Sequence, residues 1–395
     1  MRLQREFGLQ DTGTTRLKEG TTELLVPDLP EPKMMPAFFN PQGKFVRDVS
    51  LVCYDSYGSM SGRSDLCFAD AMAGVGARGI RVAHELSQYS KVYLNDVNSF
   101  SLNLGKRSAK LNSIESRCHF SMSESCAFLT ARPATGGERF DVVDLDPFGT
   151  PSPFVDCLVR SVKDGGMLSL SATDSAVLCG VYPHVAFRKY QGLPLRTDYC
   201  HEVGLRLIFG LLAITAMRFE VGIVPQFCHH DRHYFRAYCL VRAGNRHSIE
   251  NEKEMGFLLH CFACGHRSTI AHSDFFHKKE EKADATYLLC PACESSRMRV
   301  GGPLWIGEIQ SQEFVKECAK RSKLQIFQPE LDIPLYYDIA ALADKLGQRT
   351  PKITQVVEEL RSNGHSASRT RLNPNGVRTG ASVEEVQSLL TQLVR

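Results

Sequence analysis

An alternation of short apolar runs and amphipathic stretches between residues 65 and 174 constrains the fold more than any other feature. The segments DLCFAD, KVYLND, DVVDLD and MLSLSATD each have the length and apolar content of a buried strand. Between strands, apolar residues recur at helical spacing, as in GIRVAHEL and SLNLGKRSAKLN. Strands that alternate with helices are typical of a parallel sheet covered by helices on both faces. We therefore expect an α/β fold with a doubly wound sheet.

The length and a shift in composition predict how the chain divides. At 395 residues it exceeds one ordinary core, so we expect two or three compact units. The sequence becomes polar from NRHSIENEKEMG onward, which places a first domain at 1–245 and a second at 246–395. The first forty residues are dense in proline and predict an extension with little regular structure that wraps onto the first domain. Two helical patterns and a turn-rich segment at about 328–395 are typical of a winged helix.

A glycine-rich turn follows the first strand, with Gly74, Gly76 and Gly79 in the spacing G-x-G-x-x-G. This spacing brings backbone close to a nucleotide cofactor. The next strand ends at Asp96, whose carboxylate can accept hydrogen bonds from the ribose of either NAD or S-adenosylmethionine. Asp70, four residues before the first glycine, would repel a pyrophosphate but suits a cationic methionyl group. The pattern favours S-adenosylmethionine, and the alternative is a tight turn without a ligand.

An aspartate, a proline and an aromatic residue, Asp146, Pro147 and Phe148, follow the strand DVVDL. An exocyclic amine on a nucleobase is a poor nucleophile because its lone pair is delocalised into the ring. The carboxylate of Asp146 and the carbonyl oxygen of Pro147 can accept hydrogen bonds from such an amine, which turns the lone pair toward a methyl donor. Phe148 can stack on a base that is flipped out of its helix. The alternative is an Asp-Pro turn followed by a core phenylalanine.

Two Cys-x-x-Cys pairs, Cys261 with Cys264 and Cys290 with Cys293, have the spacing of a zinc ribbon at about 257–300. Four thiolates in tetrahedral geometry bind structural Zn²⁺ and stabilise a small lobe that has too little core of its own. Redox or accidental pairing is the alternative. The other ten of the fourteen cysteines are scattered in apolar surroundings and are interpreted as small core residues.

The sequence also bears on where the protein resides. The first residues, MRLQREFGLQDTG, lack the apolar centre of a signal peptide, and we find no apolar run long enough to span a bilayer. Many cysteines without a signal sequence indicate a reducing compartment. We therefore expect a soluble, cytoplasmic and monomeric protein without membrane contact.

The net charge of +3 is too small to name a partner, but the segment from residue 361 to 382 is locally basic. It contains no Asp or Glu, and it holds Arg361, Arg369, Arg371 and Arg378. Such a segment is typical either of a surface that contacts nucleic-acid phosphates or of a solvated basic loop.

Long stretches of the chain resemble the tRNA (guanine-26-N2)-dimethyltransferases, the Trm-one family. The matching stretches run through nearly the whole length and include FFNPQGKFVRDVS, GARGIR, LNDVN, DLDPFGTP, SATDSAVLCG, RKYQGLPLRTDYCHEVGLRL and GPLWIGEI. The resemblance implies a Rossmann-like class I methyltransferase domain, a C-terminal α+β domain, and S-adenosylmethionine as the methyl donor. It implies that the N2 amine of guanine 26 in tRNA is methylated once or twice, with the basic tail along the tRNA phosphates.

The resemblance also implies residues that hold the donor. Arg47 and Arg78 correspond to residues on the methionyl carboxylate, which a planar guanidinium pairs with bidentately, and Asp96 to the residue on the ribose. Relatives carry Asp-Ala near the adenine of the donor. In the corresponding region this chain has Glu124 and Ser125, which would contact the adenine in their place. The structural alternative for Arg47 is a surface ion pair with the aspartate that follows it.

On the substrate side, the resemblance makes Asp146 the catalytic carboxylate and places Phe38 and Phe148 on either side of the guanine. Ordinary core packing is the alternative for Phe38. Other functions that the sequence leaves open are methylation of another RNA base or of a DNA adenine amine, an NAD-dependent dehydrogenase, and a non-catalytic nucleic-acid binder. The last would leave the Asp-Pro-Phe turn without a purpose.

Overall fold

The structure is a computed structural model that describes residues 13–28, 37–134, 137–281 and 289–393. The chain divides into two compact units, Met1–Asp144 and Leu145–Arg395. The domain boundary at residue 245, inferred from composition, stays a prediction.

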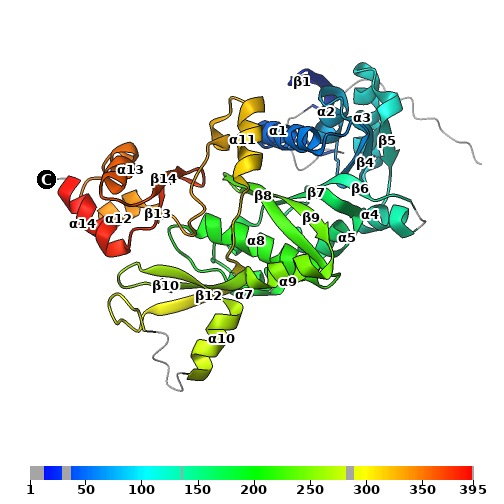
Figure 1. Ribbon diagram of the computed structural model, residues 1–395. Helices are drawn as coiled ribbons and strands as arrows, with labels where there is room; N and C mark the ends of the chain where they lie inside the picture. The colour runs from blue at the N-terminus through cyan, green and yellow to red at the C-terminus, as the bar shows by residue number, and fades with distance from the viewer. Residues whose placement is uncertain (1–12, 29–36, 135–136, 282–288, 394–395) are drawn as a thin grey trace, which may run out of the picture. The chain divides into compact units, whose positions relative to one another are not determined.

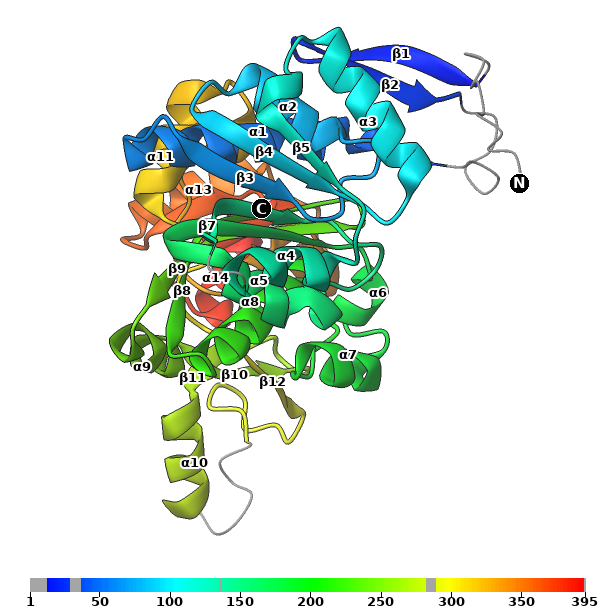
Figure 2. The ribbon, with the colours of Figure 1, turned by 90° about the vertical axis from the view of Figure 1, so that its right-hand side faces the viewer.

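The first unit contains a parallel sheet with strand order β5-β4-β3-β6. Figure 2 shows β3, β4 and β5 side by side. The strands are β3 (Leu66–Asp70), β4 (Tyr89–Asn95), β5 (Cys118–Ser121) and β6 (Phe140–Leu145). The helices are α1 (Lys44–Ser61), α2 (Ala77–Glu85), α3 (Ser99–Leu111) and α4 (Ser125–Ala134). Strands β3 and β6 are fully buried, as expected of a sheet covered on both faces. The parallel α/β arrangement predicted from the sequence is confirmed in this unit.

An antiparallel hairpin of β1 (Thr14–Glu19) and β2 (Thr22–Pro27) precedes the sheet, where little regular structure was expected. Its buried Glu19 accepts hydrogen bonds from Arg47 of α1, with an N–O distance of 2.5 Å, and lies 3.4 Å from Arg81 of α2. The Leu25 N–H donates to the Ser108 hydroxyl of α3. These contacts fix the hairpin against three helices. Residues 29–36 of the proline-rich segment lie outside the described residues.

The second unit begins with α5 (Val155–Ser161), β7 (Val162–Ala172), α6 (Ser175–Leu178), α7 (Pro183–Tyr190), α8 (Cys200–Met217), β8 (Val221–Asp231) and β9 (Tyr234–Ala243). Its strands have the order β7-β9-β8, and β9 is antiparallel to both of its neighbours, so the parallel arrangement expected for residues 65–174 does not continue to the end of this sheet. The reason is the two-residue turn between β8 and β9, since so short a connection can join only antiparallel strands. Arg232 in this turn has a φ of 54°, as hairpin turns require.

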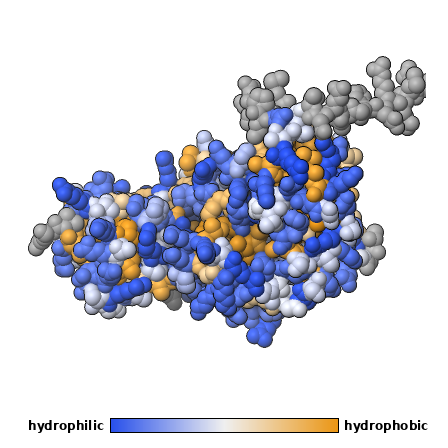
Figure 3. Space-filling view, turned by 90° about the horizontal axis from the view of Figure 1, so that it is seen from above, coloured by the Kyte–Doolittle hydropathy of each residue, from blue (hydrophilic) through white to orange (hydrophobic). Residues whose placement is uncertain are grey.

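Helix α8 forms the core of this unit. Contrary to the expectation from the sequence, its length and apolar composition are those of a helix that can cross a membrane, yet 78% of its residues are buried inside the protein. A buried core helix can have the same composition as a membrane span, and α8 packs against β8 and β12. Hydrophilic residues cover most of the face shown in Figure 3, and hydrophobic residues are visible between them.

The cysteine-bearing part and the tail follow. The former contains α9 (Asn245–Lys253), β10 (Met255–Cys261), β11 (Arg267–Ala271), α10 (His272–Glu281) and β12 (Met298–Trp305), with strand order β11-β10-β12. After α11 (Gln312–Arg321), the tail contains β13 (Tyr337–Asp338), α12 (Ile339–Lys345), α13 (Ile353–Ser362), β14 (Ala367–Thr370), β15 (Asn373–Thr379) and α14 (Val383–Leu393). Figure 1 shows the three helices of the tail gathered beside β13 and β14. They enclose a core of their own, which includes Leu342, Val356 and Leu390.

Two of the four arginines expected along tRNA phosphates are instead buried in ion pairs. Arg378 of β15 lies 2.9 Å from Glu202 of α8 and 2.8 Å from Glu330, and only 2% of the residue is exposed. Arg371 also pairs with Glu330, and it donates to the Cys228 carbonyl of β8 over 2.8 Å. The expectation for these two arginines was wrong, because their carboxylate partners lie at least 41 residues away in the sequence.

The buried arginines also change the pKa values of the carboxylates that they pair with. Burial by itself raises the pKa of Glu202, but the charges of Arg378 and Arg206 outweigh it, and the pKa lies below its ordinary value. The pKa of Glu330 is likewise lowered, since Arg371 and Arg378 together outweigh its burial. Both carboxylates are therefore ionised at neutral pH, and the network ties the tail to α8.

Arg378→Ala removes the guanidinium that pairs with both Glu202 and Glu330. The negative charges of these two buried carboxylates are then balanced by fewer positive charges. We expect the free energy of opening of β15 to fall by about 3–5 kcal/mol. Native-state hydrogen exchange of the β15 amides measures this free energy.

Arg369→Ala is the matched control, because Arg369 is an exposed arginine on the neighbouring strand. Its effect should stay within about 0.5 kcal/mol. Equal effects of the two substitutions would mean that the buried network does not hold the tail.

Candidate active site

The glycine-rich turn lies between β3 and α2 and is tied to the end of β4. Gly74 and Gly76 have φ values of 54° and 79°, a left-handed conformation that favours glycine. One carboxylate oxygen of Asp96 accepts from the Gly74 N–H over 2.7 Å, and the other accepts from the Asn98 N–H over 2.9 Å. Asp96 thus fixes the turn and the start of α3 relative to each other. This places the predicted ribose-binding carboxylate beside the predicted cofactor turn.

Asp70, at the end of β3, is 1% exposed and accepts from the Gly79 N–H over 3.0 Å. Space at this turn is tight, because a Cβ atom added at Gly79 would lie 2.8 Å from the Leu94 side chain, which would have to shift. The hydrogen bond from the Gly79 N–H to Asp70 anchors the first turn of α2 to the end of β3.

Polar groups also connect the ends of β3, β4 and β5. The Ala71 carbonyl accepts from the Asn95 side-chain amide over 3.1 Å and from the Ser125 hydroxyl over 3.0 Å. The carboxylate of Glu124 accepts from the amides of Cys126 and Ala127 and caps α4. Ser125 and Glu124 thus both hold the start of α4 in place.

The two arginines assigned to the donor are buried and paired. Arg47 uses Nε and Nη2 for Glu19, and Nη2 also donates to the Asn40 carbonyl over 3.1 Å. The structural alternative for Arg47, a surface ion pair with Asp48, is not found among the described contacts, since Arg47 is only 8% exposed and pairs with Glu19. Arg78 pairs with Asp144, which also accepts from the Tyr54 hydroxyl.

Phe38 is 47% exposed, which speaks against core packing. Its backbone carbonyl lies over the glycine turn, 3.7 Å from where a Cβ atom of Gly74 would be. The structure thus brings Phe38 next to the turn.

The Asp146-Pro147-Phe148 turn begins directly after β6 and is described within the second unit. Pro147 is buried, Asp146 is half-buried, and Phe148 is 78% exposed, so Phe148 is not a core residue. Gly149 ends the turn with a φ of 75°. Its N–H donates to the Thr173 hydroxyl, and its carbonyl accepts from the Thr173 N–H, both over 2.8 Å. This reciprocal pair fixes the turn to the end of β7.

A second contact holds the same turn. The Tyr190 hydroxyl of α7 donates to Asp174 over 2.5 Å and lies 3.1 Å from the Thr150 hydroxyl, which donates to it. Burial, and after it the charge of Asp174, raises the pKa of Tyr190, so the phenol keeps its proton. Sequence reasoning missed Thr173, Asp174 and Tyr190. The signal for the first two was the polar Thr-Asp pair directly after the strand MLSLSA.

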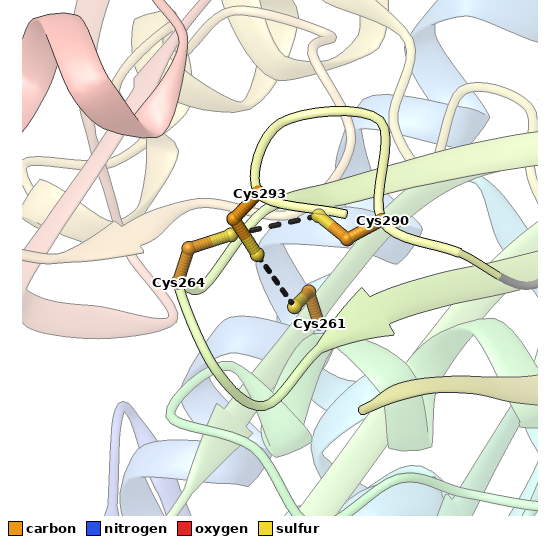
Figure 4. A group of neighbouring side chains, drawn as sticks. All are labelled: Cys261, Cys264, Cys290 and Cys293. Carbon is orange, nitrogen blue, oxygen red and sulfur yellow. Dashed lines mark hydrogen bonds between the residues drawn. The ribbon is translucent and has the colours of Figure 1, made fainter. Parts of the chain in front are cut away.

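The four ribbon cysteines converge as predicted, and Figure 4 shows their side chains pointing toward one another from two loops. Their Sγ atoms all lie within 4.8 Å of one another. The Cys261–Cys293 distance is 3.7 Å and the Cys264–Cys290 distance is 3.6 Å. A tetrahedral Zn²⁺ with Zn–S bonds of about 2.3 Å holds its sulfurs roughly 3.8 Å apart. The spacing therefore fits this ion.

The two loops that carry these cysteines have the same backbone geometry. The Cys261 N–H donates to the carbonyl five residues later, and so does the Cys290 N–H. The residue after the second cysteine of each pair, Gly265 or Glu294, has a positive φ of 88° or 56°. Two matched turns of this kind aim four sulfurs at one point.

Comparison with known proteins identifies the family. Residues 17–391 match the family described as N2,N2-dimethylguanosine tRNA methyltransferase. The chain is 34% identical over 393 residues to the tRNA (guanine(26)-N(2))-dimethyltransferase of Methanothermobacter thermautotrophicus, covering 96% of this chain and 99% of the relative. It is 32% identical to the tRNA (guanine(26)-N(2)/guanine(27)-N(2))-dimethyltransferase of Aquifex aeolicus, covering 95% and 96%.

A solved structure agrees with these relatives. The fold is similar to that of Trm1 from Pyrococcus horikoshii in complex with S-adenosyl-L-methionine, with a TM-score of 0.79 and 28% identity, over 95% of this chain and 99% of that one. The chain therefore belongs to the N2,N2-dimethylguanosine tRNA methyltransferase family.

Proposed function

We propose that the protein transfers methyl groups from S-adenosylmethionine to the N2 amine of guanine 26 in tRNA. The observation that carries this proposal is an Asp-Pro-Phe turn held rigidly at the end of a strand, in a chain of this family. The alternatives of an NAD-dependent dehydrogenase and of a DNA adenine methyltransferase gain no support from the relatives, which are named as tRNA guanine methyltransferases.

For the donor, we propose the glycine turn at Gly74 and Gly76, with Asp96 on the ribose. Both oxygens of Asp96 already accept one backbone N–H, and each has a second lone pair for a ribose hydroxyl. Asp70 anchors α2 beside this turn. Glu124 and Ser125 hold the start of α4 and take the place of the adenine-contacting residues.

Two arginines complete the proposed donor site, Arg47 and Arg78. The described bonds of Arg47 use Nε and Nη2, so we propose that Nη1 binds the methionyl carboxylate. Arg78 would share its guanidinium between Asp144 and the donor. The sulfonium is an activated methyl donor, so alignment and electrostatics supply the rate, and no strong base is required.

For the substrate, we propose that the Asp146 carboxylate and the Pro147 carbonyl accept the two hydrogens of the guanine amine. This orients the nitrogen lone pair toward the sulfonium methyl, and the aspartate stabilises the positive charge that develops on nitrogen. Phe148 and Phe38 stack on the two faces of the flipped base. Their exposure of 78% and 47% leaves ring surface for such stacking.

For tRNA, we propose that the tail is a winged helix, with the hairpin of β14 and β15 as its wing. Arg361 and Arg369 are exposed and contact phosphates in this proposal. Tyr182 and Phe187, beside and on α7, are 56% and 55% exposed and offer further surfaces for stacking on unpaired bases. For the ribbon, we propose Zn²⁺ bound by Cys261, Cys264, Cys290 and Cys293, which stabilises a lobe with a small core.

Incubation with labelled S-adenosylmethionine and a tRNA transcript tests the function. We expect labelled N2-methyl- and N2,N2-dimethylguanosine after digestion to nucleosides. The transcript with adenine at position 26 should lose this label, because adenine carries no N2 amine. Equal labelling of the two transcripts would contradict the assigned position.

Asp146→Ala removes the carboxylate acceptor, so we expect methyl transfer to fall by about 10²–10³-fold. The affinity for S-adenosylhomocysteine, measured by calorimetry, should remain within twofold. Asp156→Ala is the matched control, because Asp156 is an aspartate of the following helix whose side chain is 47% exposed and pairs with Arg160. Near wild-type turnover of Asp146→Ala would exclude the assigned role.

Removal of zinc should unfold the ribbon before the rest of the chain. We expect a strong chelator to accelerate hydrogen exchange in β10 and β12 while the amides of β3 and β4 stay protected, because the ribbon core is small. Exchange rates that do not respond to chelation would contradict a structural metal.

A further inference from the structure

A second cluster of metal-ligand side chains lies in the unit Leu145–Arg395. The Sγ atoms of Cys179 and Cys200 and a ring nitrogen of His201 all lie within 4.8 Å of one another. All three residues are half-buried. The methyl-transfer mechanism uses none of them.

Close packing of α6 on α8 brings the two cysteines together. Cys179 caps the end of α6, and Cys200 begins α8. Gly204 lies one turn after Cys200 on the same face of α8, and an added Cβ atom there would lie 3.1 Å from the Cβ of Leu178. The missing side chain of Gly204 therefore lets α6 approach, which leaves Cys179 beside Cys200.

The chain on either side of the cluster is restrained. Gly180 has a φ of 85°, and an added Cβ atom there would lie 3.0 Å from the backbone nitrogen of Arg196. The ring of His201 stacks on that of His230 with centroids 3.8 Å apart and planes 16° from parallel. The stack orients the His201 ring face to face with His230, so His230 is not counted among the ligands.

We propose that Cys179, Cys200 and His201 bind a second divalent metal ion of the zinc class, with a solvent molecule as the fourth ligand. Thiolate and imidazole are the ligands that Zn²⁺ prefers in proteins. Zn–S bonds of about 2.3 Å and Zn–N bonds of about 2.0 Å hold tetrahedral ligand atoms roughly 3.5–3.8 Å apart. The three ligand atoms lie within 4.8 Å of one another, on a framework that glycine packing and ring stacking restrain.

Such an ion would fasten α6 to α8. Helix α6 starts directly after Asp174, which accepts the Tyr190 hydrogen bond beside the Asp-Pro-Phe turn. The ion would therefore restrain the segment that carries Asp174. It is independent of the ribbon metal, and its existence does not depend on the proposed methyl transfer.

Zinc stoichiometry of the full chain tests the proposal. The protein is expressed with zinc, purified with a reductant, desalted, and analysed by inductively coupled plasma mass spectrometry. We expect two zinc ions per chain in the wild type and one in Cys179→Ser and in His201→Asn. The double variant Cys264→Ser/Cys293→Ser should also retain one. Cys239→Ser is the control, because Cys239 is a buried cysteine of β9 outside both clusters, and it should retain two.

Cobalt identifies the ligands of the retained ion. In the Cys264→Ser/Cys293→Ser variant loaded with Co²⁺, we expect thiolate charge-transfer absorption that His201→Asn shifts and Cys179→Ser weakens. One zinc per chain in the wild type together with none in the Cys264→Ser/Cys293→Ser variant would overturn the proposal. A disulfide between Cys179 and Cys200 in the reduced preparation, detected by mass spectrometry, would overturn it as well.

Discussion

The reciprocal hydrogen bonds between Gly149 and Thr173 are the constraint on which the proposed chemistry depends. They fix a turn that starts with a carboxylate and ends with a left-handed glycine, so the acceptors of Asp146 and Pro147 point in set directions. The Tyr190 hydroxyl, between Asp174 and Thr150, holds the turn from a second side. A methyl transfer that relies on alignment needs such a rigid turn, because a donor that is already activated leaves orientation as the main task of the protein.

The carboxylates at the ends of neighbouring strands bind different groups and therefore have different roles. Asp96 binds the backbone of the glycine turn, and Asp70 binds the first turn of α2. Asp144 is fully buried and pairs with Arg78. These three shape the framework, whereas Asp146, two residues after Asp144, lies on a turn next to an exposed aromatic ring. Asp70 and Asp144 are buried, whereas Asp96 and Asp146 are half-buried, and these two are the carboxylates proposed to contact the donor and the substrate.

Local patterns in the sequence predicted the features that depend on neighbouring residues. The alternation of strands and helices, the glycine turn beside Asp96 and the convergence of four cysteines all follow from spacing, and the structure contains them. Features set by distant residues were missed. The sequence around Arg371 and Arg378 predicts a basic wing that contacts phosphates, yet both arginines pair with carboxylates that are distant in the sequence. The antiparallel hairpin of β8 and β9 depends on a short turn with no glycine to mark it, and Cys179 and Cys200 are too far apart to form a motif.

The central claim is that Asp146 holds the exocyclic amine of the target guanine. The most direct measurement compares the binding of tRNA with guanine or inosine at position 26 to the wild type and to Asp146→Asn, in the presence of S-adenosylhomocysteine. Inosine lacks only the N2 amine, so a double-mutant cycle isolates its interaction with Asp146. The account predicts that the wild type prefers guanine and that the variant loses this preference. An equal preference in both proteins would show that the amine is held elsewhere.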